Sequence, residues 1–261
     1  MDNGPSLWLD GRMRHEGAVG ASGNRILAAL PADERARLLP DLEAVNLSQG
    51  TVLNEADAEI EHVYFPVRGI AALIAIGIHG EEINAAMIGN EGMVGLPVFL
   101  GTGQMPARAT VQVDIAAYRL GSAQLRAELE RGGALVELLL RYVQMVLVEL
   151  AQLVLCNSVH PLEQRAARSL LQINERLAGG GAPFEATQEF IAAMLGAGRP
   201  HLTAVMQSFR EQELLDYRRG IIHVLDAAGL ERRACACYRT IRRELNRLLA
   251  TAERYDITAE R

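Results

Sequence analysis

The most constraining part of this chain is residues 187–219, where two short helical patterns are joined by a glycine turn. Thr187 is a favoured N-cap residue. The apolar residues after it share one face of a helix: Phe190, Ile191, Met194 and Leu195. Glycines within residues 196–198 can adopt positive φ, and Pro200 then stands in the first turn of a second helix. Two helices joined by so short a turn must cross steeply, which indicates a helix-turn-helix.

The second helix has two predicted faces. Apolar residues point inward: Leu202, Val205, Met206 and Phe209. Polar and small residues remain outside: Arg199, His201, Thr203, Ala204, Gln207 and Arg210. Beyond this helix, residues 214–217 and 221–225 are typical of strands around a turn at 218–220. The sequence therefore predicts a hairpin with Arg218 and Arg219 at its tip, where they are placed to contact phosphate.

Composition gives the class of protein. With 261 residues, 49% hydrophobic and 22% charged, the chain suits two ordinary globular domains. Its three cysteines, Cys156, Cys235 and Cys237, form neither a disulfide framework nor a CxxC pair, so we expect no metal site and a reducing cytoplasm. On a helix the thiols of Cys235 and Cys237 would diverge. The sequence has no uninterrupted apolar span of membrane length and no signal-peptide core, so we expect no membrane partner.

The net charge of −6 is unevenly distributed along the chain. Up to Val159 there are 11 Arg and 19 Asp or Glu, whereas from His160 onward there are 15 Arg and 13 Asp or Glu. The C-terminal part, which contains the predicted helix-turn-helix, is therefore the basic part. Every basic residue is an arginine, whose planar fork suits phosphates and guanine edges.

Upstream, short strand-like runs alternate with glycine-containing breaks. The runs cover residues 44–47, 62–65, 70–78, 83–88 and 108–120. Many short strands at close spacing predict an antiparallel sandwich or a jelly-roll barrel. Ahead of them, residues 26–39 are typical of one short helix with Asp33 and Glu34 in its middle.

A long apolar pattern over residues 134–157 predicts a helix between these two parts. Seven positions recur at alternating steps of three and four: Val136, Leu139, Val143, Val146, Leu150, Leu153 and Asn157. Such a seam predicts pairing with a second copy, and additional apolar positions also allow packing against the barrel. Asn157 either fixes the register of the pair or caps the helix. His160 and Pro161 then break the helix and form a hinge.

In this order, the parts resemble the Crp/Fnr family of transcription regulators over residues 30–238. The most specific matches are residues 187–211 with 217–220, and residues 91–100 running on to 108–110. The resemblance implies an α+β fold with an N-terminal jelly roll like a cyclic-nucleotide-binding domain, a long dimerisation helix and a C-terminal winged helix-turn-helix. The expected parts are a flexible tail (1–22), a sensory β-barrel (23–132), a dimerisation helix (133–158), a DNA-binding domain (159–250) and a second tail (251–261).

Family members that bind cyclic AMP carry a glycine-glutamate pair followed by an arginine and a small hydroxyl residue. Gly95 and Arg108 match the glycine and the arginine, but Leu96 replaces the glutamate and Ala109, ahead of Thr110, replaces the hydroxyl residue. These five residues are the expected ligand pocket. Loss of the ribose acceptor removes a hydrogen bond of about 1.5–3 kcal/mol, which argues against ordinary cyclic AMP binding.

Two interpretations of Arg108 follow. It either binds another anionic ligand, such as a cyclic dinucleotide, or pairs with Glu82 or Glu91, and we favour the pairing. The chain also lacks the cysteine cluster of iron–sulfur members and a His/Cys pair spaced for haem, so we expect no cofactor.

The DNA contacts that the resemblance implies are altered as well. Where cyclic-AMP-type members present arginine, glutamate and arginine, this chain has Arg199, Pro200 and Ala204. Arg199 is therefore the predicted reader of a guanine edge. His201 and Thr203 are further candidates for base contact, with a merely solvated His201 as the alternative. The predicted phosphate contacts are Thr187, Gln188, Arg218 and Arg219.

These features predict a homodimeric, sequence-specific DNA-binding transcription regulator in the cytoplasm, with a pseudo-palindromic double-stranded site. A ligand or partner at the barrel is expected to modulate DNA binding, and RNA polymerase is a further implied partner. The alternative is a nucleotide-sensing interaction protein whose helix-turn-helix mediates protein contacts. An enzyme is not predicted, because no nucleophile elbow, phosphate loop or HExxH motif is present.

Overall fold

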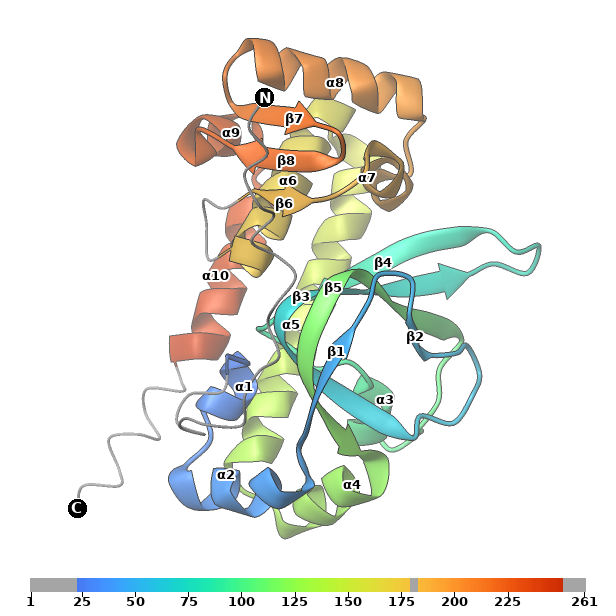
Figure 1. Cartoon of the computed structure of the whole chain (residues 1–261), viewed down its shortest axis with the longest axis vertical. Helices are drawn as coiled ribbons and strands as arrows, with labels where there is room; N and C mark the ends of the chain where they lie inside the picture. Colours follow the sequence, from blue (N-terminus) through green and yellow to red (C-terminus); the bar gives the residue numbers. More distant parts are fainter. Residues whose placement is uncertain (1–22, 179–182, 251–261) are drawn as a thin grey trace, which may run out of the picture.

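The computed structural model describes residues 23–178 and 183–250, so the predicted tails 1–22 and 251–261 lie outside it. A β-rich domain, a long helix and a second domain follow one another, which confirms the predicted α+β class (Figure 1). The first domain contains α1 (Arg25–Ala28), α2 (Ala32–Leu38), η1 (Leu39–Asp41), β1 (Glu43–Leu47), β2 (Val52–Asn54), β3 (His62–Ile76), β4 (Glu82–Ile88), α3 (Leu96–Phe99), β5 (Ala107–Gly121) and α4 (Ser122–Arg131). The remaining elements are α5 (Ala134–Val159), α6 (Leu162–Ala178), β6 (Phe184–Glu185), α7 (Gln188–Leu195), α8 (Arg199–Glu211), β7 (Leu215–Arg218), β8 (Ile221–Val224), α9 (Ala227–Arg233) and α10 (Cys237–Ala250).

The first domain is an antiparallel β-roll with the strand order β1-β5-β3-β4, and β2 also pairs with β5. The runs predicted at residues 62–65 and 70–78 form the single strand β3, because its register on β5 shifts at Pro66 and around Gly69 without ending there. Gly69 has a φ of 88°, and a Cβ on it would lie 2.1 Å from the carbonyl oxygen of Asp114. Only glycine allows this close approach of two backbones.

The prediction of one helix over residues 26–39 is wrong, because Pro31 separates α1 from α2. Proline biases the residue before it away from helical geometry. The acidic pair expected at the middle of a helix therefore lies in the first turn of α2. From there the carboxylate of Glu34 accepts hydrogen bonds from the backbone N–H groups of Ala134 at 2.8 Å and Leu135 at 3.0 Å. Glu34 thus caps the start of α5, where a negative charge is favoured.

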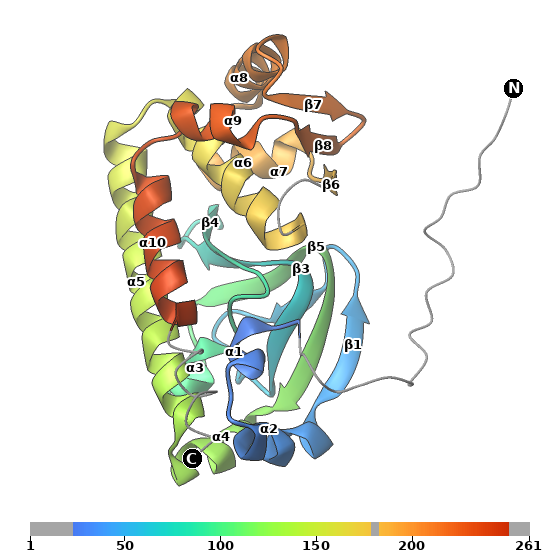
Figure 2. The same cartoon turned by 90° about the vertical axis from the view of Figure 1, so that its left-hand side faces the viewer.

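Helix α5 runs from the β-roll to the second domain (Figure 1). Its inner face is buried against the β-roll through Leu135, Leu138, Leu139 and Tyr142. The last described helix, α10, returns alongside α5, as both views show (Figures 1 and 2). Leu248 of α10 is buried in the same hydrophobic cluster as the β-roll residues. Helix α10 therefore contacts the core of the first domain.

The second domain contains a three-stranded sheet of order β6-β8-β7 and the helices α6 to α9. Its core is built from the residues predicted to face inward on α7 and α8: Ile191, Met194, Leu195, Leu202, Met206 and Phe209. This cluster continues to Ile70 and Met87 of the β-roll, so the two domains share a packed interface. The sequence pattern does not predict β6, which has two residues, or α6.

The expectation that the Cys235 and Cys237 thiols diverge is also wrong. Cys235 precedes α10, which begins at Cys237, so helical spacing does not separate the two residues. The backbone at Ala234 is extended. Both thiols lie together with Cys156 of α5 in one buried cluster.

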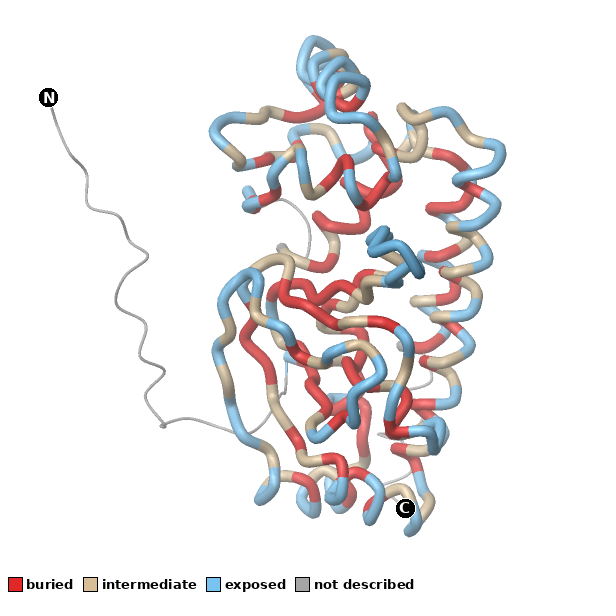
Figure 3. Tube along the Cα trace, turned by 90° about the vertical axis from the view of Figure 1, so that its right-hand side faces the viewer, coloured by how far each residue is buried: buried red, intermediate tan, exposed pale blue. Residues whose placement is uncertain are grey.

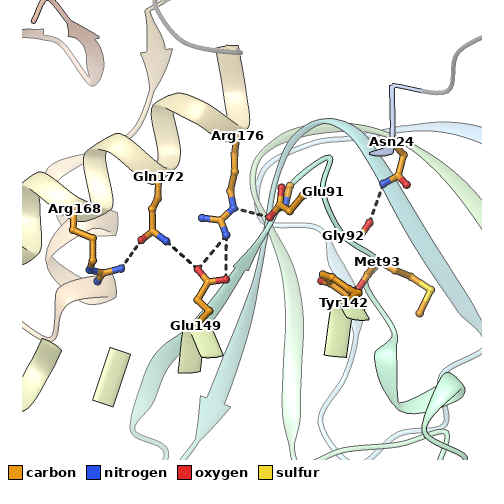
Figure 4. Close-up of polar contacts among 10 residues, drawn as sticks. Asn24, Glu91, Gly92, Met93, Tyr142, Glu149, Arg168, Gln172 and Arg176 are labelled. Atoms are coloured by element: carbon orange, nitrogen blue, oxygen red, sulfur yellow. Dashed lines mark hydrogen bonds and ion pairs between the residues drawn. The ribbon is translucent and has the colours of Figure 1, made fainter. Parts of the chain in front are cut away.

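A buried ion network joins the β-roll, α5 and the second domain (Figure 4). Arg176 of α6 donates from Nε to Glu91 at 2.7 Å and from Nη2 to the two carboxylate oxygens of Glu149 at 3.0 and 3.1 Å. Gln172 donates to Glu149 at 3.2 Å and accepts from Arg168. Glu91 follows β4, Glu149 belongs to α5, and the other three residues belong to α6.

Nearly all of the Arg176 side chain is removed from solvent. Burial alone lowers the pKa of Arg176, but the carboxylates of Glu149 and Glu91 raise it further, and the net pKa lies above its ordinary value. The guanidinium therefore stays charged. Removing one partner of this network is strongly destabilising, because the remaining partners stay charged and buried.

We therefore expect Arg176→Ala to lower the free energy of unfolding by about 3–5 kcal/mol, because it leaves two buried carboxylates unpaired. Urea denaturation measures this change. The control Arg232→Ala removes an exposed ion pair with Asp226 and should change stability by about 0–1 kcal/mol. Adding Glu91→Gln and Glu149→Gln to Arg176→Ala should recover part of the loss. Equal stability of Arg176→Ala and Arg232→Ala would contradict the role of the network.

Candidate functional site

Helices α7 and α8 form the helix-turn-helix. The hydroxyl of Thr187 accepts a hydrogen bond from the Phe190 N–H at 3.1 Å and caps α7. Gly196 ends α7 in the left-handed conformation with a φ of 57°, and α8 begins at Arg199 with Pro200 in its first turn. These are the caps that the sequence predicts, and they direct the start of α8 outward.

The predicted base-reading residues lie on the outer face of α8. Arg199, His201 and Thr203 are all exposed. Within the described part of the chain, Arg199 has no ion-pair partner. The Thr203 hydroxyl lies 2.8 Å from Oε1 of Gln188 and 2.9 Å from the carbonyl oxygen of Arg199. Thr203 therefore links α8 to Gln188 at the N-terminus of α7.

The hairpin of β7 and β8 turns tightly at the two predicted arginines. Arg218 pairs with Ile221 in the sheet, which leaves Arg219 and Gly220 as a two-residue turn with φ values of 50° and 84°. Two positive φ values define a type I′ hairpin turn. Arginine in this conformation costs roughly 1–2 kcal/mol, so Arg219 is not placed there for stability.

Charge around the hairpin is shared through one carboxylate. Asp216 pairs with Nε of Arg218 at 3.1 Å and with Nε of Arg210 at 3.3 Å. Arg210 is thereby held beside the hairpin, although the sequence pattern marks it only as an outer residue of α8. The result is a surface with four arginines along α8 and the hairpin tip: Arg199, Arg210, Arg218 and Arg219.

The predicted seam on α5 lies partly inside the protein. Leu139 has none of its surface exposed and packs against the β-roll, so it does not face outward. Asn157 is exposed. The other seam residues are half-buried: Val136, Val143, Val146, Leu150 and Leu153.

A neighbouring stripe of α5 is far more exposed. Leu140, Leu147 and Val154 have 57%, 61% and 69% of their surface accessible, and they recur every seven residues. Val143 and Leu150 stand between them, so successive stripe residues are alternately three and four positions apart, as in the predicted seam. The stripe is rotated around the helix relative to that seam. Figure 3 shows this outer edge of α5 in pale blue and tan. We define these five residues as the α5 stripe.

Among the described helices, α5 is the one whose length and apolar composition would allow it to cross a membrane. Its buried side, however, packs against the β-roll and carries Glu149 of the ion network. The helix is thus half covered within the chain, whereas Leu140, Leu147 and Val154 of the α5 stripe, together with Leu155 and Val159 near the helix end, are exposed among the described residues.

A cavity of about 220 Å³ lies between the β-roll and α5. Gly95, Leu96 and Ala109, three of the five residues expected in the ligand pocket, line it. Arg108 and Thr110 do not. The remaining walls come from strands β3 to β5 and from α5, and they are mostly apolar: Leu73, Met87, Met93, Leu100, Met105, Val143, Val146 and Leu150.

Arg108 pairs with Glu82 on β4, which is one of the two carboxylates expected for it, while Glu91 binds Arg176. Among the described residues that line the cavity, none is basic and two are acidic, Glu55 and Glu149. A phosphate in this cavity would therefore meet no cation. The sequence could not show this, because it does not reveal on which side of β5 the guanidinium points.

The cavity is connected to the ion network through Glu149. This residue lines the cavity and also binds Arg176 of the second domain. Tyr142 of α5 also lines the cavity; Gly92 packs against its ring, and the Tyr142 hydroxyl donates to the Met93 carbonyl at 3.4 Å. Burial raises the pKa of Tyr142, so its hydroxyl stays protonated. No local motif marks Glu149 and Arg176, because 27 residues separate them in sequence.

Comparisons with known proteins agree with this arrangement. Residues 44–131 match the cyclic nucleotide-binding domain, and residues 164–233 match the Crp-like helix-turn-helix domain. No curated protein matches the sequence.

Solved structures with the same fold include FixK2 from Bradyrhizobium japonicum, with 16% identity and a TM-score of 0.65 over 75% of this chain and 98% of that one. A Crp/Fnr transcriptional regulator from Thermus thermophilus has 21% identity and a TM-score of 0.57 over 74% and 98%. The c-di-GMP responsive regulator CLP from Xanthomonas campestris has 12% identity and a TM-score of 0.58 over 74% and 99%.

A β-roll that matches the cyclic nucleotide-binding domain, a long helix and a winged helix-turn-helix in this order define a two-domain DNA-binding transcription regulator. The two domain matches together cover more than half of the chain, and the chain belongs to the Crp/Fnr family.

Proposed function

We propose that this protein binds a pseudo-palindromic DNA site as a homodimer in the cytoplasm and regulates transcription there with RNA polymerase as a partner. The observation that carries the proposal is the outward α8, on which Arg199 is exposed and unpaired among the described residues. In a dimer, two such helices would enter successive major grooves about one helical turn apart. Phosphate contacts by Thr187, Gln188 and the hairpin arginines would fix their register.

The α5 stripe is the proposed dimer interface. Exposed leucines and valines at heptad spacing favour a second copy of the same helix over solvent. Asn157 stands one step of three beyond Val154 and continues the stripe to the helix end, next to the hinge. Pairing along α5 would bring both second domains to the same end of the dimer.

The first test replaces Leu147 at the centre of the α5 stripe. We expect Leu147→Glu to weaken dimerisation by at least about 30-fold, because loss of a central interface residue removes about 2 kcal/mol or more. Analytical ultracentrifugation over a concentration series measures this change. The control Ile78→Glu alters a residue that is 95% exposed and lies on the loop after β3. A Leu147→Glu protein that dimerises like the control would refute this interface.

The second test separates base reading from phosphate contact. The target is first selected from a pool of random DNA. Arg199→Ala should then lose about 1–3 kcal/mol of discrimination at one base pair, because a bidentate contact to guanine is gone. Arg218→Ala should weaken binding to all DNA sequences alike. It should also reduce the slope of log affinity against log salt concentration by about 1. Arg131→Ala on α4 serves as the control. Identical effects of the Arg199 and Arg218 variants would remove the distinction between their roles.

We further propose that an uncharged, apolar small molecule, and not a cyclic nucleotide, occupies the cavity between the β-roll and α5. The mostly apolar lining and the absence of a basic residue among the described lining residues support this class of ligand. The cavity touches Glu149, and Glu149 holds Arg176 of the second domain. A ligand that displaces α5 would therefore change the ion network and, through α6, the position of the helix-turn-helix.

Calorimetry tests this proposal with three probes: cyclic AMP, cyclic di-GMP and indole. We expect heat of binding only from indole. Ala86→Leu, which adds carbons inside the cavity, should weaken indole binding by about tenfold or more, because overpacking costs at least about 1 kcal/mol. The control Ala85→Leu alters the adjacent residue of β4, which does not line this cavity. Tight binding of either cyclic nucleotide would overturn the proposal.

A further inference from the structure

Four side chains from distant parts of the sequence converge where α5 ends and α10 begins. Cys156 lies in the last turn of α5, and His160 directly follows this helix. Cys235 lies in the link between α9 and α10, and Cys237 is the first residue of α10. Their ligand atoms, three Sγ and one imidazole nitrogen, all lie within 4.8 Å of one another.

The distances fit the edges of a tetrahedron around one metal ion. Sγ of Cys156 is 3.5 Å from Sγ of Cys235, and Sγ of Cys237 is 3.7 Å from Nδ1 of His160. Zinc–thiolate and zinc–imidazole bonds in tetrahedral geometry place two thiolates about 3.8 Å apart, and a thiolate and an imidazole nitrogen about 3.6 Å apart. The three cysteines are almost entirely buried and His160 is half-buried.

The chemistry of this set is that of a structural zinc site. Three thiolates and one imidazole are soft to borderline ligands, and four protein ligands leave no open position for a substrate. The local geometry explains why no CxxC motif is present: Cys156 and His160 lie one helical turn apart, and the extended backbone before α10 brings Cys235 beside Cys237. All three cysteines of the chain are used.

A buried positive charge stands next to the cluster. Arg168 of α6 acts electrostatically on both Cys156 and Cys237. Its Nε is buried without a hydrogen-bond partner in the described part of the chain, and no carboxylate pairs with it there. Zinc bound by three thiolates and a neutral imidazole carries a net charge of −1. Arg168 would balance that charge.

We propose that Cys156, His160, Cys235 and Cys237 bind one Zn²⁺ ion that joins the end of α5 to the start of α10. Binding displaces the three thiol protons into solvent and leaves the imidazole neutral, with Nδ1 as its ligand atom. The ion would close the hinge at His160 and Pro161 by tying the end of α5 to the start of α10. The site does not depend on DNA binding, whereas its effect on the orientation of the second domain rests on the proposed function.

A disulfide between Cys156 and Cys235 is the rival interpretation of the short sulfur–sulfur distance. It would leave Cys237 and His160 without a role, although both point their ligand atoms into the same cluster. It would also require an oxidant that a reducing compartment does not supply. The zinc site uses all four groups, and we therefore argue for zinc.

Metal analysis of the full-length chain, purified with a reductant and without chelator, tests the proposal directly. We expect about one Zn²⁺ per chain, and after exchange with Co²⁺ the absorption bands of tetrahedral thiolate coordination. His160→Ala should lower zinc affinity at least tenfold, because even loss of a residue that only hydrogen-bonds a ligand costs about 10–100-fold. His160→Cys should retain the ion. The control His79→Ala alters an exposed turn and should behave like the wild type.

Two further measurements keep the result independent of folding defects and of DNA. Thiol labelling of the folded wild type should be slow with zinc and at least tenfold faster after chelation, whereas an intact mass two hydrogens lower without metal would establish the disulfide and overturn the proposal. Equal zinc affinities of wild type and His160→Ala, measured by competition with a chromophoric chelator, would overturn it as well. DNA affinity is measured last, with and without chelator. A protein that binds zinc but not DNA would refute only the proposed function.

Discussion

The arrangement of the two domains depends on one buried arginine. Arg176 carries its charge into a region without solvent, where Glu91 and Glu149 are the groups that balance it. Each partner comes from a different part of the molecule, so the ion network has its full set of contacts in only one relative position of β-roll, α5 and α6. Buried charges contribute more to the choice of one arrangement than to net stability. The ion network therefore does more to fix the relative position of the two domains than to raise the free energy of unfolding.

The cavity, the α5 stripe and the cysteine cluster all lie on α5, and three residues of the stripe, Val143, Leu147 and Leu150, also line the cavity. Glu149 lies near the middle, where the cavity meets the ion network. Cys156 lies in the last turn, beside α10. One helix thus carries a wall of the cavity, the proposed interface and the connection to the second domain.

Local patterns in the sequence predicted the helix-turn-helix well. Thr187, Gly196 and Pro200 act through their own backbone geometry, so their roles can be inferred from a few neighbouring residues. The outward face of α5 was harder to predict, because apolar residues surround most of the helix. Periodicity alone does not show which of these faces packs against the β-roll. Leu139 is the example: its spacing fits the seam, but the β-roll covers it. The side on which Arg108 points, the Glu91–Arg176 pair and the meeting of Cys156 with Cys235 depend on contacts across 26 to 85 residues.

The return of α10 along α5 gives the molecule a closed topology. The described part of the chain begins in the β-roll, leaves it for the second domain and comes back with Leu248 inserted in the first core. Neither domain is then an autonomous folding unit, since each lacks a piece of its core until the whole chain is present. Folding during synthesis would remain incomplete until the last helix leaves the ribosome, and the two domains should melt as one cooperative body.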